Sequence, residues 1–231
     1  MQRAIVFDGD DTLWITEPLY DDARQRARAV VEAAGLDGAA WEELQRQMDV
    51  DNVERLGLAP TRFPTSCIEA YLALCAKASR GVDPFVKAAL LGTAGTVFSQ
   101  PAQPVPFARE ALTLLRSRGY RLALLTKGDP ALQRRRIDQS GLASLFDVIQ
   151  IVDQKTPESI IAVLEKLGVS AGSALSVGNS LRSDVSPSLA AGVQPIWIDS
   201  HVWEYERNGQ GVPDERVIVI EDLSRLLEVA S

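Results

Sequence analysis

Three carboxylates follow one short apolar run near the start of the chain. Residues 4–7 are apolar and rich in β-branched and aromatic side chains, which predicts a buried strand. Asp8, Asp10 and Asp11 come directly after it, interrupted only by Gly9. Carboxylates this close repel one another unless a positive charge lies among them, and Mg²⁺ accepts one or two carboxylate ligands. The stretch therefore predicts either a cation site, whose carboxylate can attack phosphorus, or a plain acidic turn.

Polar residues follow three later apolar runs as well. Residues 121–125, 148–152 and 174–177 each predict a strand, the first of them buried, because they are short, apolar runs bounded by polar or glycine-rich residues. Taken singly, the polar residues behind them fit a helix N-cap, a solvated lysine or a turn. Ligands of α/β sheets gather at the carboxyl ends of strands, however, so their joint occurrence predicts one site. These residues are Thr126, Lys127 and Gly128 after the first run, Lys155 after the second, and Asn179 and Asp184 after the third.

Strands and helices alternate through the second half of the chain. Such alternation predicts an α/β fold: a Rossmann-like parallel sheet with helices on both faces. The predicted helices cover residues 107–118, 130–140, 157–167, 185–191 and a final segment through Leu226 and Leu227. Further strands are expected at 195–198 and 217–220, and the first strand at 3–8.

The segment between residues 16 and 99 has a different pattern. Apolar residues recur there at helical spacing and no convincing strand lies between 16 and 98, which predicts an all-α insertion. Three prolines in residues 101–106 favour an extended linker behind it. We therefore expect a discontinuous core, residues 1–15 and 100–231, and a helical domain, residues 16–99.

The four polar segments together carry a family resemblance. The chain resembles the haloacid dehalogenase-like hydrolase superfamily, in its phosphatase branch with a helical (C1-type) cap domain after the first strand. The resemblance extends over the whole predicted core. The matching segments are Phe7-Asp8-Gly9-Asp10-Asp11-Thr12-Leu13, Leu124-Leu125-Thr126-Lys127-Gly128, Lys155-Thr156-Pro157 and Gly178 to Asp184.

The resemblance implies a role for each matching residue. It makes Asp8 the nucleophile that forms an aspartyl-phosphate and Asp10 the acid/base. It places Thr126, Lys127, Gly128 and Lys155 at the substrate phosphate, with Thr126 and Lys155 also catalytic. It implies Mg²⁺ as cofactor, held by Asp8, the Asp10 backbone carbonyl and Asp184. The implied reaction is Mg²⁺-dependent hydrolysis of a small phosphate monoester.

Asn179 departs from the family pattern, which has an aspartate at this point of the fourth segment. Asparagine keeps an oxygen acceptor but carries no charge, so we expect Asn179 to act through a water or to orient another ligand. Three alternatives stay open: a phosphoryl-transferring mutase, a phosphonate hydrolase and a catalytically silent binding module. The resemblance implies that the phosphonate reaction needs a lysine from the helical insertion, where Lys77 and Lys87 are the only lysines and neither lies in the apolar setting of a reactive lysine. The presence of Asp10 disfavours the dehalogenating branch.

Composition and charge narrow the class of protein. A formal net charge of −7 argues against a nucleic-acid partner, whereas a small phosphorylated metabolite fits a locally positive site. No apolar run reaches the roughly 18 residues of a membrane span. Met1 leads directly into a strand, and Cys67 and Cys75 are expected to be free thiols, which predicts a cytoplasmic protein. No pattern in the sequence specifies an oligomeric state.

Three further positions have mainly structural interpretations. His201, the only histidine, is expected in a surface loop rather than at the site. The run 134–136 of three arginines is expected to be a solvated helix face. Trp14 is expected either to line the site or to fill the junction between the domains.

Overall fold

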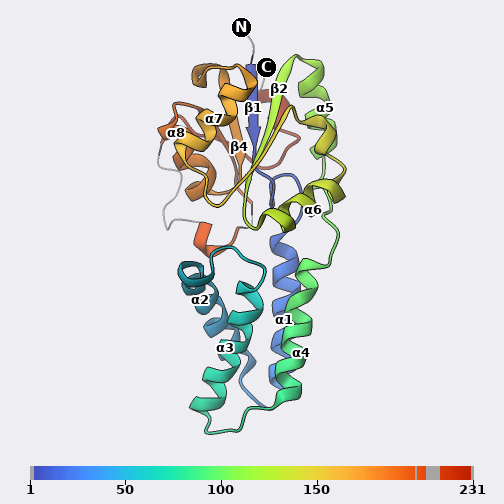
Figure 1. Cartoon of the computed structure of the whole chain (residues 1–231), viewed down its shortest axis with the longest axis vertical. Helices are drawn as coiled ribbons and strands as arrows, with labels where there is room; N and C mark the ends of the chain where they lie inside the picture. The colour runs from blue at the N-terminus through green and yellow to red at the C-terminus, as the bar shows by residue number, and fades with distance from the viewer. Residues whose placement is uncertain (1–2, 201, 207–213, 230–231) are drawn as a thin grey trace. The chain divides into compact units, whose positions relative to one another are not determined.

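The computed structural model describes residues 3–200, 202–206 and 214–229. The chain divides into two compact units, one made of Met1–Glu17 with Pro101–Ser231 and the other of Pro18–Gln100. The first unit contains the sheet, and the second is built from helices (Figure 1).

The first unit is built on a six-stranded parallel sheet with strand order β3-β2-β1-β4-β5-β6. β1 therefore lies between β2 and β4, at the point where the strand order reverses. In open α/β sheets, this is where ligands bind. The strands are β1 Arg3–Phe7, β2 Tyr120–Lys127, β3 Val148–Val152, β4 Ala174–Gly178, β5 Gln194–Ile198 and β6 Ile218–Ile220.

Helices cover both faces of this sheet, as the alternating pattern predicts (Figure 1). Successive strand residues point to opposite faces, so Ile5 and Phe7 join one hydrophobic cluster and Ala4 and Val6 another. The first cluster includes α5 and the second includes α7. The helices are α5 Ala108–Ser117, α6 Pro130–Ser140, α7 Pro157–Leu167, α8 Ser186–Ala190 and α9 Leu226–Val229.

Local sequence signals start the two helices that follow β2 and β3. Asp129 caps α6 by accepting a hydrogen bond from Leu132 N, and Thr156 caps α7 by accepting from Ser159 N. A proline opens each helix, where its fixed φ suits the first turn. These caps hold the ends of β2 and the segment after β3 at the same edge of the sheet.

The second unit, residues 18–100, is described in full, and its regular elements are all helices joined by short turns. Its hydrophobic cluster gathers Trp41, Phe63 and Tyr71 with small residues of the first helix, such as Ala23 and Ala27. Both cysteines, Cys67 and Cys75, are buried in it as free thiols. The helices are α1 Glu17–Ala33, α2 Gly38–Leu56, α3 Arg62–Lys77 and α4 Pro84–Gly95, followed by the 3₁₀ turn Thr96–Phe98.

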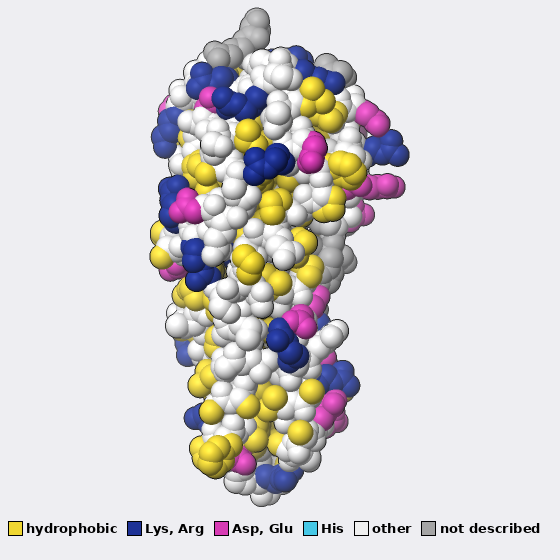
Figure 2. All heavy atoms as spheres, turned by 90° about the vertical axis from the view of Figure 1, so that its right-hand side faces the viewer, with side chains coloured by type: hydrophobic (Ala, Val, Ile, Leu, Met, Phe, Trp, Pro, Cys, Tyr) yellow, Lys and Arg dark blue, Asp and Glu magenta, His cyan; other side chains and the backbone are white. Residues whose placement is uncertain are grey.

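The surface mixes charges of both signs. On the face shown in Figure 2, Lys and Arg side chains are interspersed with Asp and Glu rather than gathered in one basic area. None of the helices in the described part of the chain is both long and apolar enough to cross a membrane.

Candidate active site

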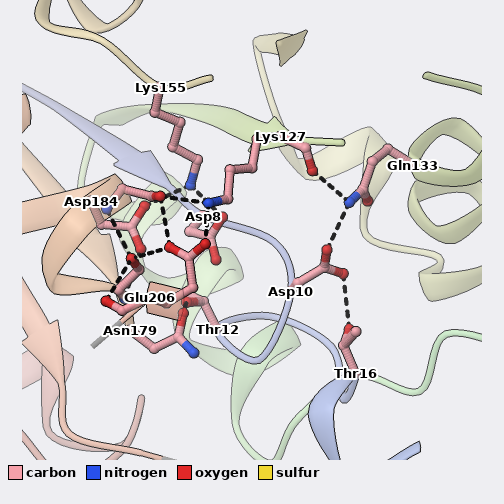
Figure 3. A network of polar contacts seen from close by, with 12 residues as sticks. Asp8, Asp10, Thr12, Thr16, Lys127, Gln133, Lys155, Asn179, Asp184 and Glu206 are labelled. Atoms are coloured by element: carbon pink, nitrogen blue, oxygen red, sulfur yellow. Dashed lines mark hydrogen bonds and ion pairs between the residues drawn. The ribbon is translucent and has the colours of Figure 1, made fainter. Parts of the chain in front are cut away.

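Asp8, Lys155 and Asp184 form one buried cluster at the carboxyl edge of the sheet (Figure 3). Asp8 N donates to Val177 O at 2.9 Å, which continues the β1–β4 pairing into the site. Lys155 Nζ donates to the Asp8 carboxylate and, at 2.6 Å, to Asp184 Oδ1. One ammonium group thus holds two carboxylates that come from different strands.

This buried cluster contains two carboxylates and one ammonium group, so a further positive charge would stabilise it. Burial raises the pKa of Asp8 to about 7, because the Lys155 ammonium only partly offsets burial and Asp184 adds repulsion. Although burial favours the neutral lysine, Asp184 and Asp8 together raise the pKa of Lys155 above its ordinary value. A divalent cation between Asp8 and Asp184 would add positive charge and lower the pKa of Asp8. Two buried oxygen donors of this kind fit the way proteins hold Mg²⁺.

Thr126 presents an unused hydroxyl at the end of β2. The side chain is buried, and its Oγ1 has no hydrogen-bond partner among the residues that the structure describes. A Cβ added at Gly9 would collide with the Trp14 ring and lie 3.2 Å from Thr126 Oγ1. The hydroxyl therefore faces the motif that carries Asp8, where an acceptor such as a phosphoryl oxygen would satisfy it.

The turn after β4 fixes Asp184. Ser180, the N-cap of the π-helical turn Leu181–Val185, donates its backbone N–H to Asp184 Oδ2 at 3.0 Å. A Cβ at Gly178 would collide with the Asp184 carboxylate, so only glycine leaves room for it. Asn179 is buried, accepts from Thr12 Oγ1 at 3.4 Å, and its backbone carbonyl accepts from Trp197 Nε1 at 2.9 Å.

Asp10 faces away from this cluster, toward Gln133 and Thr16 (Figure 3). Its carboxylate accepts from Trp14 Nε1 at 2.7 Å, Thr16 Oγ1 at 2.9 Å and Gln133 Nε2 at 2.7 Å. The described residues contain no group of three or more His, Cys, Asp or Glu side chains that could hold a metal ion. Because the Asp10 carboxylate is directed to these donors, its side chain does not join Asp8 and Asp184, and the backbone carbonyl of Asp10 stays a predicted ligand.

Arg136 corrects one prediction. Arg134 and Arg135 are exposed, as a solvated helix face requires, but Arg136 is buried and its guanidinium pairs with Asp10. Burial raises the pKa of Asp10, but Arg136 and three further donors outweigh it and hold that pKa below its ordinary value. Helical spacing is the sequence signal that could have identified Arg136 as buried. Gln133, Arg136 and Ile137 lie on one face of α6, and all three are buried.

Lys127 pairs with Glu206, a residue outside the four sequence motifs. Its Nζ forms an ion pair with Glu206 and donates to Ser183 Oγ at 2.6 Å. Glu206 lies in the 3₁₀ turn Glu204–Glu206, between β5 and β6. The neighbouring Gly128, at φ +127°, uses its backbone N to donate to Val152 O at 3.0 Å.

Three positions considered in the sequence remain: Asp11, Trp14 and His201. Asp11 accepts from the backbone N of Thr16 and Glu17 at 2.8–3.0 Å, so it caps α1 rather than joining Asp8. Trp14 is fully buried and donates to Asp10. His201 lies outside the described residues.

Comparisons with known proteins agree on one family. A family model described as haloacid dehalogenase-like hydrolase matches residues 2–192. A glyceraldehyde 3-phosphate phosphatase of Methanopyrus kandleri is 28% identical over 225 residues, 93% of this chain and 92% of the relative. A phosphoserine phosphatase of Thermus thermophilus is 35% identical over 99 residues, about two fifths of each chain (41% and 40%). A haloacid dehalogenase-like hydrolase structure from Xanthomonas campestris superposes with a TM-score of 0.79 at 25% identity, covering 99% of this chain and 91% of that one.

Proposed function

This chain belongs to the haloacid dehalogenase-like hydrolase family, and we propose that it hydrolyses a small phosphate monoester with Asp8 as the nucleophile. The observation that carries the proposal is the buried cluster in which Lys155 holds both Asp8 and Asp184. Beside it, the unpartnered Thr126 hydroxyl supplies a donor for a phosphoryl oxygen. Phosphoryl transfer needs chiefly positioning and charge stabilisation, which these four side chains supply.

In the first step, an Asp8 carboxylate oxygen bonds to phosphorus while the ester P–O bond breaks. Asp10 gives its proton to the departing oxygen, and the phosphoryl group stays on Asp8 as an aspartyl-phosphate. In the second step, water bonds to phosphorus, Asp10 takes the proton, and the bond to Asp8 breaks to release inorganic phosphate. In both steps Lys155 neutralises charge on the phosphoryl oxygens, and the Thr126 hydroxyl donates a hydrogen bond to one of them.

Asp10 must change its partners to take part. In this structure its carboxylate accepts hydrogen bonds from Gln133, Trp14, Thr16 and Arg136, an arrangement that favours the ionised form. A general acid needs a proton to give. We therefore place proton donation after a side-chain rotation that takes Asp10 away from these donors and toward the leaving oxygen.

Asp8, Asp184 and the Asp10 backbone carbonyl would hold Mg²⁺, with Asn179 contributing through a water. When bound, the ion supplies positive charge that keeps Asp8 ionised and offsets the charge of the phosphoryl oxygens.

We assign the helical unit 18–100 as a cap domain that selects the leaving group. The names of the relatives, glyceraldehyde 3-phosphate phosphatase and phosphoserine phosphatase, favour a substrate with a short carbon chain.

The test is release of inorganic phosphate from a panel of small esters, including glyceraldehyde 3-phosphate and phosphoserine, with Mg²⁺ and with chelator. Mg²⁺-dependent release is expected, and Asp8→Asn should abolish it, a loss on the order of 10⁵-fold or more. The variant should keep its fold, because Lys155 retains Asp184 as partner. Isomerisation of a sugar phosphate without release would indicate a mutase, cleavage only of phosphonates a phosphonate hydrolase, and no reaction a silent module.

A further inference from the structure

Glu206 is a buried carboxylate outside the four family motifs that contacts two of them. It is only 7% exposed. Its Oε2 accepts from Ser180 Oγ at 2.6 Å and from Ser183 Oγ at 2.7 Å, both in the turn after β4. Its other oxygen, Oε1, pairs with Lys127 Nζ at the end of β2. Glu206 therefore ties the ends of two sheet strands together (Figure 3).

These contacts lead directly to the candidate active site. Ser183 lines a small internal cavity together with Asp8, Lys155 and Asp184, and it also accepts from Lys127 Nζ at 2.6 Å. Ser180, the other serine on Glu206, donates its backbone N–H to Asp184. Lys127, the cation paired with Glu206, therefore contacts a residue, Ser183, that lines the same cavity as Asp8, Lys155 and Asp184.

Glu206 and Lys127 stabilise each other through their opposite charges. A buried carboxylate is costly unless it is paired and hydrogen-bonded, and Glu206 has both kinds of partner. Burial raises the pKa of Glu206, but Lys127 and the two serine hydroxyls outweigh it and lower that pKa. Lysine has a flexible four-carbon stem, so without this anchor its ammonium could adopt many positions.

The position of Lys127 in the sequence indicates why its ammonium group is held in place. Lys127 follows Thr126, whose buried hydroxyl has no partner among the described residues and is the proposed donor to a phosphoryl oxygen. Figure 3 shows the side chain of Lys127 directed toward the Asp8 and Asp184 cluster rather than outward. A cation fixed there can stabilise negative charge on a phosphoryl oxygen, provided that it does not move when charge develops.

We propose that Glu206 is a positioning residue for phosphoryl transfer, which holds Lys127 Nζ beside the site through its own anchorage on Ser180 and Ser183. This inference rests on the proposed phosphatase function. The side-chain contacts of Glu206 among the described residues are with Lys127, Ser180 and Ser183, and not with Asp8 or Asp184. Glu206 acts through Lys127.

A double-mutant cycle tests this directly. Glu206→Gln, Lys127→Met and the double variant are assayed for kcat/KM and for inhibition by inorganic phosphate, at matched Mg²⁺. Each single variant is expected to lose about 10- to 100-fold in kcat/KM, the effect of one misplaced charged contact. The double variant should match Lys127→Met alone, because removing the anchor has no further effect once its cation is gone. The inhibition constant for phosphate should rise in parallel.

Controls separate positioning from a merely structural role. Gln keeps the size of the side chain and one acceptor for a serine hydroxyl, so Glu206→Gln is expected to fold, as checked by thermal melting. Glu206→Asp keeps the charge but shortens its reach, and should show an intermediate loss. Glu165→Gln changes an exposed glutamate of α7 and should have native kinetics.

The outcomes distinguish the two proposals. If the native protein releases no phosphate, the proposed function fails. If the native protein is active but Glu206→Gln keeps native kcat/KM, or if the two substitutions lower kcat/KM additively, only the role of Glu206 is overturned.

Discussion

One guanidinium nitrogen of Arg136, Nη1, donates hydrogen bonds to both carboxylate oxygens of Asp10, at 3.0 and 3.1 Å. Asp10 comes from the first motif and Arg136 from α6, 126 residues later in the chain. Gln133, one turn earlier in α6, donates to the same carboxylate at 2.7 Å. Helix α6 therefore sets the resting position of the proposed acid/base residue.

Removing this guanidinium should destabilise the fold. We expect Arg136→Met to lower the free energy of unfolding by about 1–3 kcal/mol, because the half-buried Asp10 carboxylate loses the guanidinium with which it pairs. Urea denaturation measures this change. Arg135→Met, next to it on the exposed face, is the matched control and should change stability by less than about 0.5 kcal/mol. Equal losses in the two variants would contradict the assigned role of Arg136.

Replacing the acid/base carboxylate should affect turnover more than binding. Asp10→Asn is expected to lower kcat by about 10²–10⁴-fold with little change in KM, because an amide cannot transfer the proton. Asp11→Asn is the contrast, since Asp11 accepts from the backbone of Thr16 and Glu17 and should keep most of the native turnover. Steady-state kinetics with saturating Mg²⁺ measures both. Native kcat in Asp10→Asn would remove Asp10 from the mechanism.

Thr126→Val should separate stability from activity. The Oγ1 of Thr126 is buried without a partner, so replacing it with a methyl group should leave the free energy of unfolding unchanged or raise it by about 1 kcal/mol. The same change removes a donor to the phosphoryl group and should lower kcat by about 10²–10³-fold. Thr126→Ser keeps the hydroxyl and should retain most activity. A Val variant with native turnover would show that the hydroxyl does not contact the phosphoryl group.

Asn179→Asp should strengthen Mg²⁺ binding while weakening the metal-free protein. A further buried carboxylate near Asp8 and Asp184 attracts a cation but repels its neighbours when none is bound. In chelator, the thermal midpoint should fall by roughly 2–4 °C for each kcal/mol lost. Added Mg²⁺ should then raise it by more than it raises the native midpoint, and half-maximal activity should need less Mg²⁺. An unchanged Mg²⁺ requirement would indicate that Asn179 lies outside the reach of the ion.

The Glu206–Lys127 pair should make stability depend on pH in the acid range. The pKa of Glu206 is lowered in the folded protein, so the unfolded chain binds its proton more readily. The stability that this carboxylate contributes is therefore fully present above its ordinary pKa of about 4.3 and is lost as the pH falls through the lowered value. The gap in unfolding free energy between the native protein and Glu206→Gln should stay constant from about pH 6 to 8 and narrow below about pH 4.3. A gap independent of pH would mean that Glu206 is not ionised.

The sheet and its reacting edge were predictable because their signals are local. An apolar strand such as Ala4–Phe7 followed by Asp8, or Thr156-Pro157 opening a helix, depends on residues next to one another in the chain. Parallel strands must end at one edge, so the sequence alone predicted that Asp8, Lys155 and Asp184 would meet. The helical character of residues 18–100 followed in the same way, from spacing along each helix.

Only the tertiary structure decided how the charges around that edge pair. Arg136 belongs to a run of three arginines, and the side chain that turns inward is set by how α6 packs against the first motif. Glu206 sits in a short turn with no pattern of its own, and it meets Lys127 because β5 brings its following segment past the turn after β4. Pairings between residues 79 or 126 positions apart leave no periodic trace in the sequence, because each partner alone is equally suited to solvent.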